Sequence, residues 1–355
     1  MKKRIVSLLL AAALLTGAAS AAGEEGAAEQ PDLDLSAASA VLMEKETGAL
    51  LYEKESHQQL EPASVTKVMT LLLIMEDLDS GRLSKEDLVT VSAAAAGMGG
   101  SQVYLKEGEQ LSAGELIKCI AVVSGNDAAV AMAEHLAGSE AAFVERMNRR
   151  AQELGMKDTA FVNCTGLPAA GHHSSAYDIA LMSRALIQNH PDIRTYTTIW
   201  MDTLRDGTFQ LANTNKLIRF YEGATGLKTG STDSAKYCLS ATAEREGMEL
   251  IAVVLKSPTG QQRFEDAKTL LNYGFSTYAD RFETAKALLN YGFAGYSLVT
   301  VAPSEPISPI PVTLGTADSV QPVLTQESQI LLPKAEAGKV STTLSLPDTL
   351  QAPVE

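Results

Sequence analysis

The chain has 355 residues, 45% of them hydrophobic and 20% charged, so it is long enough for a main domain plus an appendage and can bury a core. Lys and Arg number 29 against 43 Asp and Glu, and the net charge of −14 argues against nucleic acid as the main partner, because phosphate binding needs a basic surface. Beyond the N-terminus no stretch is as long as a membrane span, which argues against a polytopic membrane protein.

The first 21 residues have the layout of a secretory signal peptide. Three cations at positions 2–4 precede an apolar run over residues 5–15, and small residues follow up to Ala21. The alternative, an N-terminal membrane anchor, needs about 18–20 apolar residues, and this run is shorter. We therefore expect residues 1–21 to be removed. The protein is then exported, either to the cell envelope on the outer side of the cytoplasmic membrane or into the medium.

Beyond an acidic leader at residues 22–34, the pattern predicts one sheet with helices. Residues 38–44 and 49–53 read as a hairpin, and so do residues 236–243 and 249–256. Apolar residues at three- and four-residue spacing predict helices over residues 64–78, 112–123, 127–137, 140–154 and 176–189. Strands at both ends with helices between them indicate an α+β fold, in which the first and last hairpins meet in an antiparallel sheet flanked by helices.

A near repeat follows the last hairpin. Residues 263–275 read RFEDAKTLLNYGF and residues 281–293 read RFETAKALLNYGF, identical at 11 of 13 positions. Each copy is predicted to be a helix that ends at a glycine cap, Gly274 or Gly292. Two copies are too few for a solenoid, so we interpret them as a local duplication. One native slot can hold only one copy, and the other is expected to be displaced or poorly packed.

The composition changes along the chain and predicts the domains. Residues 35–275 form the main domain, residues 276–293 the duplicated helix or linker, and residues 294–355 a small β-rich domain. Eight of the 13 prolines lie at or beyond Pro303, and no aromatic residue follows Tyr296. The three cysteines, an odd and sparse set, predict neither a disulfide framework nor a metal site, and are expected to be buried as small hydrophobic side chains.

Ser64-Val65-Thr66-Lys67 is the first motif with chemical potential. Residues three apart in a helix share a face, so the Ser64 hydroxyl and the Lys67 amine can lie within hydrogen-bond distance. A lysine serves as a base only when neutral, so its pKa must fall through burial or a second cation. Taken alone the motif is weak, because such a pair also occurs by chance at the start of a surface helix.

Two further motifs are equally weak when taken singly. Ser124-Gly125-Asn126 lies in a tight turn between two predicted helices, where Ser124 could relay a proton and Asn126 could hold an amide, or both could simply cap helices. In Lys228-Thr229-Gly230, the first two side chains could hold a carboxylate, and Gly230 could let a peptide pair closely with a strand edge. The plain alternative there is an ordinary turn lysine.

Together and in this order, the three motifs make coincidence improbable. Over about residues 35–275 the sequence resembles the serine D-alanyl-D-alanine carboxypeptidases, the low-molecular-mass penicillin-binding proteins. The resemblance extends to longer passages: PASVTKVMT (62–70), GGSQVYLKEGE (99–109), SGNDAAVAMAEHLAGSEAAFVERMN (124–148), LGMKDTAFVNCTGL (154–167), GHHSSAYDIA (171–180), NTNKL (213–217) and GLKTGSTDSAKYC (226–238). It implies a β-lactamase/transpeptidase-like domain followed by a truncated β-rich second domain.

The resemblance also implies catalytic roles. Ser64 would attack the carbonyl of the penultimate D-alanine with Lys67 as general base, and Ser124 would relay a proton to the leaving nitrogen. The backbone N–H groups of Ser64 and Ser231 would form the oxyanion hole. The family usually has an aromatic residue or His at the position of Ser231, and commonly Asp-Gly where this chain has Thr225-Gly226.

Substrate and partners follow from the same resemblance. Asn126 would hold the substrate amide, Lys228 and Thr229 would bind the terminal carboxylate, and Gly230 would lie along the peptide. The implied partners are a peptidoglycan stem peptide ending in D-Ala-D-Ala and, as inhibitors, β-lactam antibiotics, with no nucleic acid, no metal and no cofactor. The family's terminal amphipathic helix is not seen, so a membrane anchor is expected to be absent from this chain.

Other functions remain open at this point. A class A β-lactamase is expected to have Ser-Asp-Asn and a glutamate in a loop that positions the water. Here the middle motif is Ser-Gly-Asn, and the candidate Glu145–Asn148 lies in a helical pattern rather than in a loop. An inactive wall-binding or sensor protein would be expected to have lost Ser64 or Lys67. A Ser-His-Asp hydrolase would need a Gly-x-Ser-x-Gly elbow, and the neighbours His172 and His173 fit loop structure better than a catalytic base. A metallopeptidase would need two histidines at ligand spacing with a nearby acid.

Overall fold

The computed structural model describes residues 31–301, 306–323, 328–340 and 345–351. The predicted signal peptide and residues 22–30 of the leader lie outside the described residues. The chain divides into two compact units, Met1–Phe275 and Ser276–Glu355.

The first unit is built on a five-stranded antiparallel sheet in the order β2-β1-β9-β8-β7. Its strands are β1 (Ser39–Glu44), β2 (Leu50–Lys54), β7 (Ala224–Thr232), β8 (Lys236–Arg245) and β9 (Met248–Ser257). Both predicted hairpins are present, and β1 pairs with β9, so the prediction that the first and last hairpins meet is confirmed. The sequence placed Lys228-Thr229-Gly230 at a strand edge without giving bounds for the strand, and the structure has it on β7, an edge of the sheet.

Helices and two short hairpins make up most of the rest of the first unit. The helices are η1 (Ala63–Thr66), α1 (Lys67–Asp79), α2 (Ala93–Ala96), α3 (Ala113–Val123), α4 (Asn126–Ala137), α5 (Glu140–Glu153), α6 (Ala176–Asn189), η2 (Pro191–Ile193), α7 (Arg194–Thr197) and α8 (Leu217–Phe220). The short hairpins between them are β3 (Leu88–Thr90) with β4 (Gln110–Ser112) and β5 (Met201–Leu204) with β6 (Phe209–Ala212). The α+β class predicted from the sequence is confirmed.

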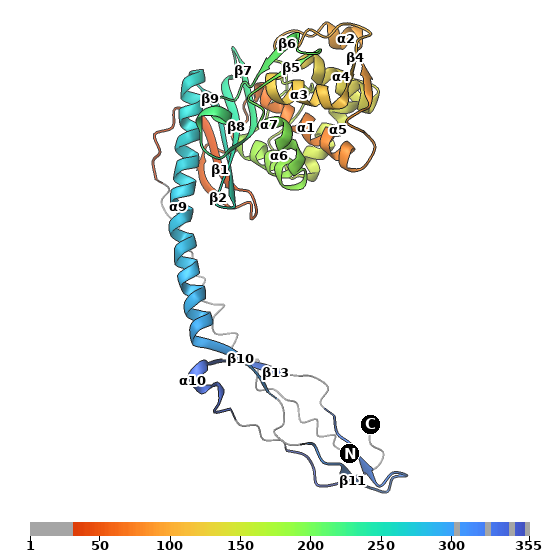
Figure 1. Ribbon diagram of the computed structural model, residues 1–355, viewed down its shortest axis with the longest axis vertical. Coiled ribbons are helices and arrows are strands. Elements are labelled where there is room, and N and C mark those ends of the chain that lie inside the picture. Colours follow the sequence, from red (N-terminus) through yellow and green to blue (C-terminus); the bar gives the residue numbers. More distant parts are fainter. Residues whose placement is uncertain (1–30, 302–305, 324–327, 341–344, 352–355) are drawn as a thin grey trace. The chain divides into compact units, whose positions relative to one another are not determined.

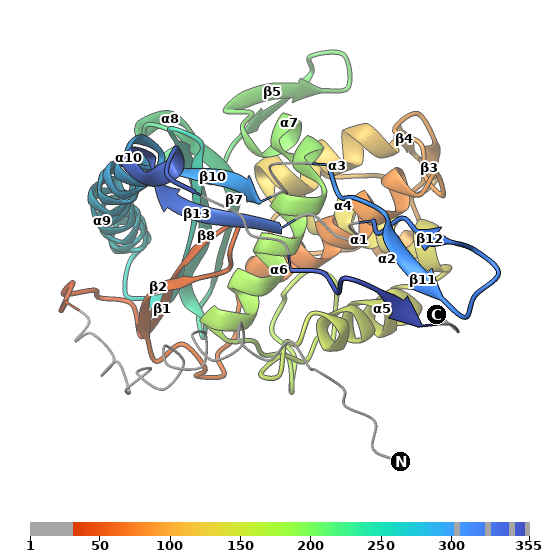
Figure 2. The ribbon, with the colours of Figure 1, turned by 90° about the horizontal axis from the view of Figure 1, so that it is seen from below.

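Each face of the sheet has its own hydrophobic core. One core packs α1, α3, α4 and α6 against the sheet, with side chains such as Val41 and Val253 pointing into it. The other core lies under the start of α9 (Gly260–Gly295), where Phe264 and Leu270 pack against alternate sheet residues such as Leu42. The ribbon views show α6 on one side of the strands and the start of α9 on the other (Figures 1 and 2). The sheet is therefore covered on both faces, and its strands are largely apolar on both sides.

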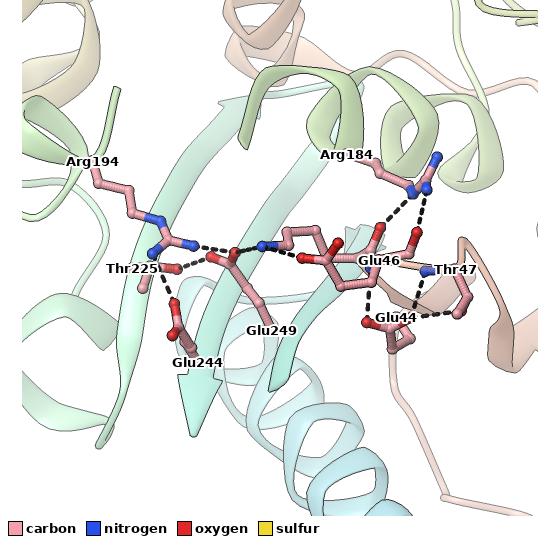
Figure 3. A network of polar contacts seen from close by, with 9 residues as sticks. Glu44, Glu46, Thr47, Arg184, Arg194, Thr225, Glu244 and Glu249 are labelled. Carbon is pink, nitrogen blue, oxygen red and sulfur yellow. Dashed lines mark hydrogen bonds and ion pairs between the residues drawn. The ribbon is translucent and has the colours of Figure 1, made fainter. Parts of the chain in front are cut away.

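A polar network anchors one end of the sheet (Figure 3). The buried Glu249 carboxylate of β9 accepts a hydrogen bond from Arg194 and lies 3.4 Å from Lys45 Nζ. The Thr225 hydroxyl of β7 lies 2.8 Å from Glu249 Oε1. Arg184 of α6 donates to the backbone carbonyls at the β1–β2 turn. The network fixes the start of β7, the strand that carries Lys-Thr-Gly.

Helix α9 contradicts the predicted glycine caps. It runs unbroken through both copies of the repeat, and neither Gly274 nor Gly292 has a positive φ. A Cβ on Gly274 would lie 2.6 Å from a Leu250 methyl, so this glycine allows the helix to approach the sheet closely rather than ending it. In the second copy, Leu288 is 67% exposed and Phe293 75% exposed, in agreement with the expected poor packing of one copy.

The second unit contains small sheets, as the composition predicts. Strand β10 (Tyr296–Val301) pairs with β13 (Ser328–Pro333), and β11 (Ile310–Thr313) lies between β12 (Ser319–Val320) and β14 (Leu350–Gln351). One helical turn, α10 (Lys334–Ala337), follows β13. Within the described ranges, no helix of either unit combines the length and the apolar character that a membrane crossing requires.

Candidate active site

The Ser-x-x-Lys motif spans the junction of η1 and α1. Ser64 lies in the first helical turn, as predicted, but this turn is the 3₁₀ turn η1, and α1 begins at Lys67. In a 3₁₀ helix the side chains at i and i+3 are eclipsed, which brings Ser64 and Lys67 directly together. Lys67 Nζ lies 3.1 Å from Ser64 Oγ.

The Lys67 amine is fully buried among acceptors. Its Nζ donates to Asn126 Oδ1 at 2.6 Å and to the Thr165 carbonyl at 2.7 Å. Burial lowers the pKa of Lys67 to about 7, while the Asp127 carboxylate opposes this shift. A neutral amine has two N–H groups and one lone pair. Because both of these oxygens can only accept, they use the two N–H groups and leave the lone pair facing the Ser64 hydroxyl.

The second motif joins α3 to α4, as predicted. Ser124 caps α3 in the left-handed conformation (φ 64°), and its buried hydroxyl has no hydrogen-bond partner among the described residues. Asn126 begins α4, and its Nδ2 donates to the Gly99 carbonyl at 2.7 Å, which turns its Oδ1 toward Lys67. The neighbouring Asp127 carboxylate accepts from two backbone N–H groups of the 99–105 loop and fixes that loop.

The third motif lies on edge strand β7, beside η1. Lys228 is 1% exposed, and its Nζ donates to the Thr229 carbonyl at 3.0 Å. Thr229 Oγ1 donates to Thr214 Oγ1 at 2.7 Å. A Cβ on Gly230 would lie 2.9 Å from Ser64 N, so only glycine lets β7 pass this close to the nucleophile's turn. Ser231, the next residue, is exposed.

Two buried basic side chains, Lys228 and Arg263, lie at this strand. Burial, and then the charges of Lys67 and Arg263, hold the pKa of Lys228 well below its usual range. Arg263 of α9 donates to the Gly230 carbonyl at 3.1 Å and to the Cys238 carbonyl at 3.3 Å. From the sequence, Arg263 is recognisable only as the first residue of the near repeat, with no predicted role in the site. No local pattern marks an arginine that reaches the third motif from 33 residues away.

The structure therefore brings parts of all three motifs to one place. Hydrogen bonds join Ser64, Lys67 and Asn126, and the backbone at Gly230 packs against that of Ser64. The three cysteines are buried and free, as expected. Among the described residues no cluster of His, Cys, Asp and Glu could hold a metal ion.

Comparison with solved structures gives the class of protein. Penicillin-binding protein 6B from Escherichia coli superposes with a TM-score of 0.65 at 34% identity, over 87% of this chain and 88% of that one. Penicillin-binding protein D2 from Listeria monocytogenes, in its ampicillin-bound form, gives a TM-score of 0.64 at 34% identity, over 69% of this chain and 100% of that one. The fold is that of the low-molecular-mass penicillin-binding proteins.

The sequence comparisons give the family. Residues 24–259 match the D-alanyl-D-alanine carboxypeptidase family, and the chain belongs to it. The carboxypeptidase DacF of Bacillus subtilis (strain 168) is 47% identical over 281 residues, which are 78% of this chain and 72% of that protein. DacD of Escherichia coli (strain K12) is 40% identical over 248 residues, 68% of this chain and 63% of that protein. The family inferred from the three motifs is confirmed.

Proposed function

We propose that the protein is a serine D,D-carboxypeptidase that removes the terminal D-alanine from peptidoglycan stem peptides through an acyl-enzyme on Ser64. The observation that carries this proposal is the buried Lys67 amine, 3.1 Å from Ser64 Oγ and with a pKa of about 7. An amine with this pKa is largely neutral at physiological pH and can act as a general base. Family membership supports the same reaction.

Acylation follows from this geometry. Ser64 Oγ attacks the carbonyl of the penultimate D-alanine while its proton passes to the lone pair of Lys67. The developing oxyanion is stabilised by the backbone N–H groups of Ser64 and Ser231. The proton taken up by Lys67 is relayed through the buried Ser124 hydroxyl to the nitrogen of the leaving D-alanine as the C–N bond breaks, which returns Lys67 to its neutral form. The ester on Ser64 is then hydrolysed by water, which restores the hydroxyl and releases the shortened peptide.

Recognition of the substrate depends on the other motif residues. The Asn126 side chain holds the peptide amide, and the edge of β7 at Gly230 pairs with the extended peptide. Lys228 and Thr229 bind the terminal carboxylate. Because an anion favours the charged form of a nearby amine, a bound carboxylate opposes the lowering of the Lys228 pKa.

A β-lactam resembles the D-Ala-D-Ala terminus and acylates the same serine, but its ester is hydrolysed slowly. The ampicillin-bound form of the Listeria relative supports this expectation. The substrate is part of the cell wall, and the predicted signal peptide agrees with that location. We therefore place the enzyme in the cell envelope, on the outer side of the cytoplasmic membrane, or outside the cell.

The test is release of D-alanine from diacetyl-Lys-D-Ala-D-Ala by the purified protein, with Ser64→Ala as the matched control. We expect release by the wild type and none by the variant. A wild type that releases no D-alanine but turns over a chromogenic cephalosporin would make the protein a β-lactamase. A protein that does neither would contradict the proposal and favour a wall-binding role.

A further inference from the structure

His172 is buried behind the nucleophile's turn and is not needed as an acid or base in the steps above. It lies in the loop between α5 and α6 and is 4% exposed. Its Nδ1 accepts from the Val162 backbone N–H at 3.1 Å, and its Nε2 lies 2.8 Å from Thr66 Oγ1. Because Nδ1 must accept, the proton of the neutral ring is on Nε2, which donates to the Thr66 hydroxyl.

These two contacts join two segments of the chain that both bear on the Lys67 amine. Thr66 is the last residue of the Ser64 turn η1 and directly precedes Lys67. Val162 leads into the loop over residues 163–167, whose Thr165 carbonyl accepts from Lys67 Nζ. The imidazole therefore joins the two backbone segments whose separation sets the position of this amine.

The loop and the turn have little freedom to shift independently. Gly166 packs directly on η1, where an added Cβ would lie 1.9 Å from the Ala63 carbonyl oxygen. Asn163 Oδ1 accepts from the Gly166 backbone N–H at 2.7 Å and so fixes the shape of the loop. His172 is the side chain that connects this rigid loop to the hydroxyl of Thr66.

We propose that His172 is a positioning residue of the acylation step: by bridging Thr66 and Val162, it holds the Thr165 carbonyl against Lys67 so that the amine's lone pair faces Ser64. The proposal rests on the proposed function. Burial, with a contribution from neighbouring His173 and against that of Glu61, lowers the pKa of His172 to about 4. The ring therefore stays neutral, with its acceptor nitrogen free for Val162, across the physiological range.

Two substitutions separate the bridge from plain packing. Leucine in His172→Leu fills much of the same space but makes neither hydrogen bond. Glutamine in His172→Gln offers one donor and one acceptor on its amide and can replace both contacts. His190→Leu is the matched control, because His190 is another buried histidine, bonded to Asp79 at the far end of α1.

The measurement is the rate constant of acylation by a fluorescent penicillin, together with kcat and KM for D-alanine release and the melting temperature. For His172→Leu we expect acylation and kcat to fall by about 10- to 100-fold with KM little changed, as small displacements of catalytic groups do. His172→Gln should restore most of the rate. His190→Leu should lower the melting temperature and leave acylation unchanged.

Thr66→Val provides a second arm that keeps the test decisive if His172→Leu does not fold. Substitutions of two residues that act as one bridge cause non-additive losses. The double variant Thr66→Val with His172→Leu should therefore lose no more activity than the worse of the two single variants. If His172→Leu does not fold, His172→Gln takes its place in the double variant. Wild-type acylation by His172→Leu would overturn the proposal, and so would acylation losses that merely follow melting temperature in all variants. If the wild-type protein is not labelled at all, the proposed function fails instead.

Discussion

Two effects act in opposite directions on the pKa of the single residue Lys67. Its complete burial destabilises the charged amine, while the nearby Asp127 carboxylate stabilises it. The result is a pKa near neutrality rather than an amine locked in either form. An amine in this state can take the Ser64 proton and release it again within one catalytic cycle.

This pKa makes a direct prediction for the pH dependence of acylation. Only neutral Lys67 can accept the Ser64 proton, and its neutral fraction falls as the pH drops through about 7. The acylation rate with a fluorescent penicillin should therefore fall about tenfold for each pH unit below that value and level off above it. A rate that does not change between about pH 5.5 and 8.5 would mean that another base accepts the proton.

Lys67→Arg separates the charge of this side chain from its basicity. A guanidinium keeps the positive charge but is never neutral in a protein, so it cannot accept a proton. We expect acylation to decrease by about 10²- to 10⁴-fold, the usual contribution of a general base. The same penicillin assay measures it, with circular dichroism to verify folding. Acylation near the wild-type rate would remove Lys67 from the mechanism.

At the scale of elements, α9 presents the same sequence in two environments. The first copy is held at Asp266, whose carboxylate accepts from Ser36 and Ser257, whereas Thr284 stands at this position in the second copy. The apolar side chains of the first copy complete the core on one face of the sheet. Corresponding residues of the two copies can therefore be compared within the same helix, one in a packed and one in an exposed environment.

Leu270 and Leu288 are equivalent positions in the two copies. Leu270 is fully buried and Leu288 is 67% exposed. Leu270→Ala should lower the free energy of unfolding by about 2–5 kcal/mol because it leaves a cavity. Leu288→Ala should change it by less than about 0.5 kcal/mol. Urea unfolding of both variants tests the pair, and equal losses would show that the second copy is also packed.

The sequence predicts a helix or strand well when the pattern that indicates it lies within the element's own residues. Helices such as α3 and α6 lie within one or two residues of their predicted bounds, because their apolar spacing is regular. Strand β7 lacks such a pattern, and its Gly230 serves close approach to η1. Gly274 shows the same limit, because a glycine that caps a helix and one that packs against a sheet look alike in sequence.

The same distinction applies to the candidate site. The three motifs could be found because each is a short contiguous pattern with a known chemical use. Arg263 and His172 could not, because their contacts depend on tertiary folding that brings α9 to β7 and one loop to η1.

At the scale of the whole molecule, every residue of the candidate site belongs to the first unit, Met1–Phe275. The Listeria relative is matched over its entire solved chain by 69% of this chain. We therefore predict that a shortened chain ending after Phe275 is acylated by penicillin at the rate of the full chain. Loss of acylation in a shortened chain that still melts cooperatively would give the second unit a part in catalysis.

The proposed reaction requires a covalent bond between Ser64 and the acyl group. This bond can be detected from the mass of the intact protein after incubation with benzylpenicillin, followed by peptide mapping. We predict the mass of one added penicillin, located on the peptide that contains Ser64, and no added mass in Ser64→Ala. An unmodified wild-type protein, or an adduct on a different residue, would rule out an acyl-enzyme on Ser64.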